Sequence, residues 1–158
     1  MSQEAVGRRY AAAIFELAKE EGTLSAAATQ LGDFAACYRE SAELRDVLDN
    51  PLVPEPQRVA VLVEVAGRLG ASDTVKRALR VIFRARRLRV VPDIASRLLL
   101  LVDDEQKVLR AHVTSAKPLG ESYLTRLRAQ LEQSTGRKVV LATDADPSLI
   151  AGIVTKIG

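Results

Sequence analysis

The first two thirds of the chain place apolar residues at offsets of three and four, which is the spacing of an amphipathic helix. Residues that commonly begin or end helices interrupt this pattern: Gly22 and Gly70 are expected stops, Asn50 precedes a proline, and Ser72 is an expected N-cap. Six helices are therefore predicted before Gln106. They are about 4–21, about 25–40, a short segment with Leu44, Val47 and Leu48, then 56–69, one beginning at 73, and one opened by Pro92 and Asp93.

Beyond Lys107 the apolar residues alternate with polar ones, which is the period of a strand rather than of a helix. Strands are predicted at 108–115, 138–143 and 153–157, with an amphipathic helix stopped by Gly136 between the first two. The predicted fold class is mainly α: an N-terminal six-helix bundle over 1–105, followed by a small α/β domain over 106–158. We place the linker between these domains at 104–107.

Composition favours packed helices and excludes several kinds of site. Hydrophobic residues make up 47% of the 158 residues, but aromatic residues only 4%, so the core must be aliphatic. The single cysteine, Cys37, excludes an internal disulfide and is interpreted as a core residue. His112 has no second histidine near it, so no metal site and no cofactor are expected. The longest apolar run, 98–102, is too short to cross a membrane, and no secretory signal is evident after Met1.

Charge is concentrated in the middle of the chain. Residues 68–97 hold nine basic and two acidic side chains, whereas residues 1–67 hold six basic and eleven acidic ones. Four arginines recur at offsets of three and four and are predicted to form one basic face of the fifth helix: Arg77, Arg80, Arg84 and Arg87. This face could be merely solvated, could bind an acidic partner helix, or could bind nucleic acid; for nucleic acid the chain lacks aromatic platforms beside the arginines.

Enzyme signatures are lacking. The glycines do not form a phosphate-binding loop, and no Gly-Lys-Ser or Gly-Lys-Thr run occurs. The carboxylates of Asp103, Asp104 and Glu105 diverge around a helix axis, and Asp144 and Asp146 are typical turn residues beside Pro147. We therefore expect no catalytic residues.

Three runs, in this order and spacing, resemble one family. They are the basic helix ending in Arg86-Arg87-Leu88, the run Val-Thr-Ser-Ala-Lys-Pro-Leu at 113–119, and the run Asp-Pro-Ser-Leu-Ile-Ala-Gly-Ile-Val-Thr-Lys-Ile-Gly at 146–158. With the helical first two thirds, the chain resembles the delta subunit of F-type ATP synthases, called oligomycin-sensitivity-conferring protein in mitochondria. The resemblance extends over nearly the whole chain.

The resemblance implies a non-catalytic stator subunit that links the alpha/beta catalytic head to the peripheral b-subunit stalk and so supports proton-driven ATP synthesis. It implies that N-terminal helices of alpha subunits bind between the first and fifth helices, and that the C-terminal domain contacts the b stalk. Carried over by position, the alpha-binding residues are Tyr10, Ala11, Ile14, Phe15, Leu79, Ile82 and Phe83. At least three of these seven are expected to fill the bundle core instead.

Membrane association would be indirect, at the cytoplasmic face of the energy-transducing membrane, most simply a bacterial plasma membrane. A nucleic-acid-binding module using the basic fifth helix is the alternative function; under the resemblance no nucleic acid is expected as a partner.

Two departures from the family accompany the resemblance. The family usually has paired glycines where this chain has Ala151 and Gly152. Relatives continue beyond the position of Gly158 with a further strand and a final helix, so either this sequence is truncated or this tail is missing. Either case weakens the expectation that this particular chain binds the stalk.

Overall fold

The computed structural model describes residues 2–150 and 152–158, so the predicted departure at Ala151 lies outside the described residues. The chain divides into two compact units, Met1–Val102 and Asp103–Gly158. This division falls three residues before the end of the first domain as predicted from the sequence, inside the last helix of the bundle.

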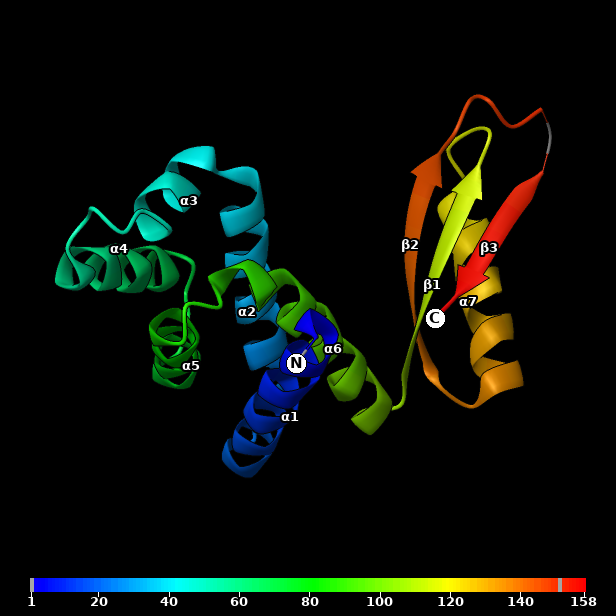
Figure 1. Ribbon diagram of the computed structural model, residues 1–158. Coiled ribbons are helices and arrows are strands. Elements are labelled where there is room, and N and C mark those ends of the chain that lie inside the picture. The colour runs from blue at the N-terminus through cyan, green and yellow to red at the C-terminus, as the bar shows by residue number, and fades with distance from the viewer. Residues whose placement is uncertain (1, 151) are drawn as a thin grey trace. The chain divides into compact units, whose positions relative to one another are not determined.

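The first unit is built from helices joined by short connections (Figure 1). In the part of the chain that the structure describes, the helices are α1 (Gln3–Glu21), α2 (Leu24–Glu40), α3 (Ala42–Leu48), α4 (Glu55–Arg68), α5 (Asp73–Arg84), the 3-10 helix η1 (Leu88–Val90) and α6 (Val91–Glu105). The six predicted helices are therefore confirmed, and the mainly α fold class with them.

Serine hydroxyls begin three of these helices and a glycine ends the first. The Ser72 Oγ accepts a hydrogen bond from the Val75 backbone N–H at 3.3 Å, which confirms the predicted N-cap of α5. Ser2 and Ser41 cap α1 and α3 in the same way. Gly22 has a φ of 69°, the left-handed conformation that glycine adopts without a steric penalty, and α1 ends there as predicted.

The end of α5 differs from the prediction. The helix ends at Arg84, and Arg86 has a φ of 57°, so the chain turns away from the helix axis before Arg87. The sequence has no glycine or proline at this point. The helical spacing of the arginines therefore predicted that the helix continues to Arg87. The prediction that Arg87 belongs to the helical basic face was wrong.

An aliphatic core holds the first unit together, as the composition requires. Its largest fully buried side chains include Leu31 and Phe34 of α2, Leu62 of α4, Leu79 of α5 and Ile94 of α6. Full burial of each such side chain stabilises the fold by roughly 1.5–3 kcal/mol relative to exposure. Most of the stability of these short helices therefore comes from packing rather than from intrinsic helix propensity.

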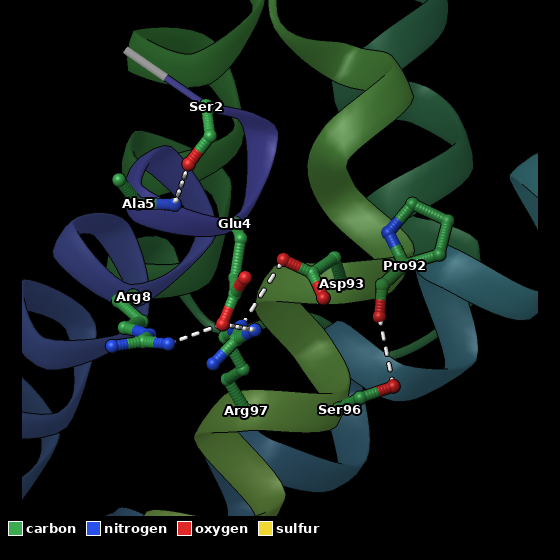
Figure 2. Close-up of polar contacts among 8 residues, drawn as sticks. All are labelled: Ser2, Glu4, Ala5, Arg8, Pro92, Asp93, Ser96 and Arg97. Carbon is green, nitrogen blue, oxygen red and sulfur yellow. Dashed lines mark hydrogen bonds and ion pairs between the residues drawn. The ribbon is translucent and has the colours of Figure 1, made fainter.

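Polar contacts join the start of α1 to the start of α6 (Figure 2). The Glu4 carboxylate pairs with Arg8 in its own helix and with the Arg97 guanidinium of α6 at 3.4 Å. Arg97 also donates from Nε to the Asp93 Oδ2 at 3.2 Å. The two helices come so close that a Cβ at Gly7 would overlap the Asp93 carboxylate. Glycine at this position therefore permits the close approach of α1 and α6.

The second unit contains β1 (Val108–Ser115), α7 (Glu121–Thr135), β2 (Lys138–Ala145) and β3 (Ile153–Ile157). The three strands form one sheet in the order β2-β1-β3, with β1 parallel to β2 and antiparallel to β3. The strand positions and the intervening helix confirm the predicted mixed α/β module, although β2 continues two residues beyond its predicted end.

One face of this sheet packs against α7. Ala111 and Val113 of β1 and Val139 of β2 are buried on that face, while Arg110 and His112 are exposed on the other. Arg110 donates from Nη2 to Oδ1 of the buried Asp103 at 3.0 Å, so the end of α6 is held against β1. The alternation of buried and exposed positions is the period-two pattern read from the sequence.

Candidate partner-binding surface

The contact between α1 and α5 is fixed at one end by a polar cluster. The Thr74 hydroxyl of α5 donates to the Glu21 carboxylate of α1, with Oγ1 lying 2.7 and 2.9 Å from its two oxygens. The Arg77 guanidinium donates to the same Thr74 Oγ1 at 3.3 Å and lies 4.0 Å from Glu21. Thr74 is buried, so this cluster anchors the two helices to each other.

Helical spacing from this cluster shows which side chains border the seam between α1 and α5. On α1, Ala13 and Leu17 precede Glu21 by eight and four residues and so share its face. On α5, Ala78 and Val81 follow Thr74 by four and seven residues and share the face that meets Glu21. The side chain of Leu17 is 49% exposed and that of Val81 is 58% exposed. The seam is therefore bordered by two exposed large apolar side chains with small alanines beside them.

Most of the residues that the resemblance assigned to alpha binding lie in the core instead. Five of the seven are buried, with exposed fractions of 6% or less: Ala11, Ile14, Leu79, Ile82 and Phe83. The expectation that at least three would be core is therefore met. Their side chains pack against the rest of the bundle and offer almost no surface to a partner.

The two remaining predicted residues, Tyr10 and Phe15, are half-buried and lie on different faces of α1. Tyr10 precedes Leu17 by seven residues and so lies on the face turned to α5. Phe15 shares a face with Lys19, whose Nζ lies 5.7 Å from the ring centre, and with Arg8, which pairs with Glu4 near α6. Helical spacing therefore puts Tyr10 on the side of the seam and Phe15 away from it.

Two candidate residues were missed in the sequence, Leu17 and Val81. Leu17 follows Ile14 by three residues and so continues the apolar spacing of α1, and Val81 lies just outside the buried stripe of α5. One signal could have found Val81. The helix already carries a complete apolar stripe, and Val81 is an additional apolar residue at the margin of its polar side.

The predicted basic face is only partly continuous. Arg77 and Arg84 are exposed, whereas Arg80 is half-buried and its Nε has no hydrogen-bond partner among the described residues. Arg87 lies beyond the helix. The exposed part of the basic face is therefore the pair Arg77 and Arg84, next to Val81.

The described residues contain no cluster of histidine, cysteine and carboxylate side chains that could hold a metal ion. Among the helices of the described ranges, none has the length and apolar character needed to span a bilayer. His112 Nε2 lies 2.7 Å from Asp144 Oδ2 on the exposed face of the sheet. Both side chains are largely in solvent, and this geometry makes a surface pair.

Comparison with known proteins agrees with the fold. The family model described as "ATP synthase delta (OSCP) subunit" matches residues 6–158. The ATP synthase subunit delta of Myxococcus xanthus is 38% identical over 160 residues, which covers 100% of this chain and 88% of the relative. The corresponding subunit of Geotalea uraniireducens is 35% identical over 158 residues with the same coverage. That of Cereibacter sphaeroides is 36% identical over 153 residues, covering 97% of this chain and 82% of the relative.

A chain in the cryo-EM structure of the Toxoplasma gondii mitochondrial ATP synthase hexamer has the same fold, with a TM-score of 0.68. It is 24% identical, and the match covers 94% of this chain and 83% of that chain. None of these comparisons supports the nucleic-acid alternative. The full-length match to the family and the identity of about one third to its members show that this chain belongs to the ATP synthase delta (OSCP) subunit family, the non-catalytic stator subunits of F-type ATP synthases.

Proposed function

We propose that the seam between α1 and α5 binds the N-terminal helix of an alpha subunit, and that this chain thereby attaches the catalytic head to the stator. The exposure of Leu17 and Val81 on either side of the seam carries the proposal. An amphipathic helix laid along such a seam would cover both side chains, which is the helix-in-groove mode of recognition. Ala13 and Ala78 allow the backbone of the partner to approach closely.

Covering these two side chains gives a useful share of the binding energy. Complete burial of a leucine or valine is worth roughly 1.5–3 kcal/mol, so covering the exposed half of each contributes about 1 kcal/mol. Tyr10, half-buried on the same side, adds an aromatic contact. The core residues beneath, Ile14 and Ile82 among them, hold the two helices at a fixed separation, and their role is to position the seam.

The arginines beside the seam are suited to steering rather than to anchoring. Arg77 and Arg84 are exposed, and exposed charges increase the rate of association with an acidic partner more than they slow dissociation. Their effect should decrease as salt is raised, because exposed charges are screened beyond about 8–10 Å.

The second unit is proposed to contact the peripheral b-subunit stalk. In this arrangement the chain is a peripheral subunit at the cytoplasmic face of the membrane and touches the membrane only through the complex. Its mechanism is mechanical: rotary catalysis exerts torque on the head, and a tight, non-catalytic connection to the stalk resists that torque.

The experiment that tests the proposal measures binding of a synthetic alpha N-terminal helix to the full chain by fluorescence anisotropy. Leu17→Ala and Val81→Ala should each raise Kd by about five- to tenfold, the equivalent of about 1 kcal/mol. Leu100→Ala is the matched control, because Leu100 is 62% exposed on α6 and lies on neither helix of the seam. Equal, small effects of all three substitutions would reject the seam as the binding site. Preferential binding of single-stranded or duplex nucleic acid at physiological salt would favour the alternative function.

A further inference from the structure

A second, strongly basic surface lies on the first unit, away from the seam. Two adjoining hollows share Asp49 and Arg89. The smaller, of about 350 Å³, is bordered by the end of α3, the start of α4, the end of α5 and η1. The larger, of about 750 Å³, continues from it along α2 and α3. We call the two hollows together the arginine groove.

Basic side chains dominate the arginine groove. Its lining contains two carboxylates, Asp46 and Asp49, and five arginines: Arg39, Arg45, Arg58, Arg86 and Arg89. The Asp49 carboxylate is already engaged, because it accepts hydrogen bonds from the Tyr38 hydroxyl at 3.0 and 3.1 Å and lies 3.5 Å from Arg89. The groove therefore has a surplus of positive charge that the chain itself does not neutralise.

Arg58 lies in the wall of the smaller hollow with incomplete hydrogen bonding. Its guanidinium is 5.1 Å from the centre of the Phe83 ring, and its Nη1 donates a long bond of 3.4 Å to the Leu48 carbonyl oxygen. Its Nε is buried and has no partner among the described residues. A buried donor of this kind without an acceptor is unfavourable, because it has lost its hydrogen bonds to water and gained none in the protein. An oxyanion that entered the hollow could accept from the guanidinium.

Arg86 stands at the mouth of the same hollow in a conformation that arginine rarely adopts. Its φ of 57° is the left-handed conformation that usually belongs to glycine after a helix. A residue with a Cβ is strained there relative to glycine, because its Cβ comes too close to the following carbonyl oxygen. Among the described residues, none forms a hydrogen bond or ion pair with its guanidinium. A strained residue whose charged side chain has no internal partner is a candidate for function.

We propose that the arginine groove binds an acidic, extended segment of a partner polypeptide. Carboxylates of the segment would pair with Arg58 and Arg86, in the charge-assisted geometry that guanidinium groups favour. An apolar side chain of the segment would lie against the exposed Pro51 at the smaller hollow, whose other apolar lining residues, Leu48 and Leu88, are almost fully buried. The length of the two joined hollows, with arginines along both, fits an extended peptide better than a free inorganic anion. The proposal concerns a surface other than the α1–α5 seam and does not depend on alpha binding.

The experiment uses the full chain and a peptide with fluorescein at its N-terminus, fluorescein-Glu-Leu-Glu-Glu-Leu-Glu-amide, whose binding is followed by anisotropy at low and at physiological salt. Binding should be saturable, and Arg86→Gly should weaken it by at least about fivefold, as for loss of a charge-assisted pair. The same substitution should raise the Tm, because glycine is unstrained at this φ, so weaker binding cannot be attributed to unfolding. Arg89→Gln, at the junction of the hollows, should also weaken binding.

Arg68→Gln is the matched control, because Arg68 is an exposed arginine of α4 that lines neither hollow. It should change the Kd by less than about twofold, in line with the small effect of distant screened charges. Equal weakening by Arg68→Gln and Arg86→Gly, or no saturable binding at low salt, would overturn the proposal. Displacement of the peptide by inorganic phosphate beyond that caused by sodium chloride of the same ionic strength would assign the groove to free anions and overturn it as a peptide site.

Discussion

The substitution Phe83→Ala separates a core residue from a binding residue in α5. Phe83 was predicted from the family resemblance to contact the alpha helix, but its side chain is only 6% exposed and packs in the core. Val81, two residues earlier, is 58% exposed. We expect Phe83→Ala to act on folding stability and Val81→Ala to act on partner binding.

The magnitude for Phe83→Ala follows from its surroundings. Truncating a buried phenylalanine costs about 3–5 kcal/mol, because apolar burial is lost and a cavity remains. The Arg58 guanidinium over the ring would also lose its cation–π contact, worth about 0.5–1 kcal/mol. A unit of this size has a free energy of unfolding of about 5–15 kcal/mol, so the substitution removes a large part of it. The corresponding fall in Tm is about 15–30 °C.

Thermal and urea unfolding followed by circular dichroism at 222 nm measure this loss. Val81→Ala, the matched control on the same helix, should change the free energy of unfolding by less than about 0.5 kcal/mol, as is typical of surface positions. A Phe83→Ala variant within 1 kcal/mol of the wild type would refute the assignment of Phe83 to the core. Such a variant with weaker alpha-helix binding would restore the interface role predicted from the sequence.

Three further expectations can be measured on the same chain. The pKa of Tyr38 is raised to about 12 by burial and by its hydrogen bond to Asp49, so the neutral hydroxyl stabilises the fold below about pH 10. Urea unfolding should therefore show a loss of stability as pH rises from about 10 to 12, by about 2–3 kcal/mol at most, and Tyr38→Phe should lose less over this range. Gly7→Ala should lower stability by about 1–2 kcal/mol by displacing the Asp93 carboxylate, and should become neutral or stabilising in an Asp93→Ala background, where alanine is the better helix former. Limited proteolysis should first cut near 104–107 and leave a stable fragment of about the first hundred residues, as expected of an exposed linker; first cuts within α2 or α4 would contradict the division into two units.

Sequence pattern was sufficient for the helices and strands because their ends carry explicit signals. Ser72 caps α5, Gly22 ends α1, and the alternation from Val108 onwards marks the first strand. The end of α5 lacks such a signal. Arg86 adopts the left-handed conformation there, and only a glycine at this position would have predicted the end of the helix from the sequence. Local pattern cannot reveal a backbone conformation that tertiary contacts impose on an unsuitable residue.

The proposed binding surface was harder to predict than the fold. An apolar stripe shows which side of a helix faces inward, but it does not show how closely the neighbouring helix covers each residue. Tyr10 and Phe15 both flank the buried stripe of α1, yet only the position of α5 shows that Tyr10 borders the seam. Leu17 and Val81 are recognisable as surface residues only once the packing of α1 and α5 is known.

The central claim is that the seam between α1 and α5 meets an alpha subunit in the assembled ATP synthase. A photo-reactive amino acid at position 81, in place of the exposed Val81, tests this directly in F1 heads assembled with the full chain. The same group in place of Ala60, exposed on α4, is the control. We expect irradiation to crosslink position 81 to the N-terminal region of an alpha subunit, as identified by mass spectrometry, and position 60 to give no such product. Crosslinking of position 81 to another subunit, or equal crosslinking to alpha from both positions, would contradict the account.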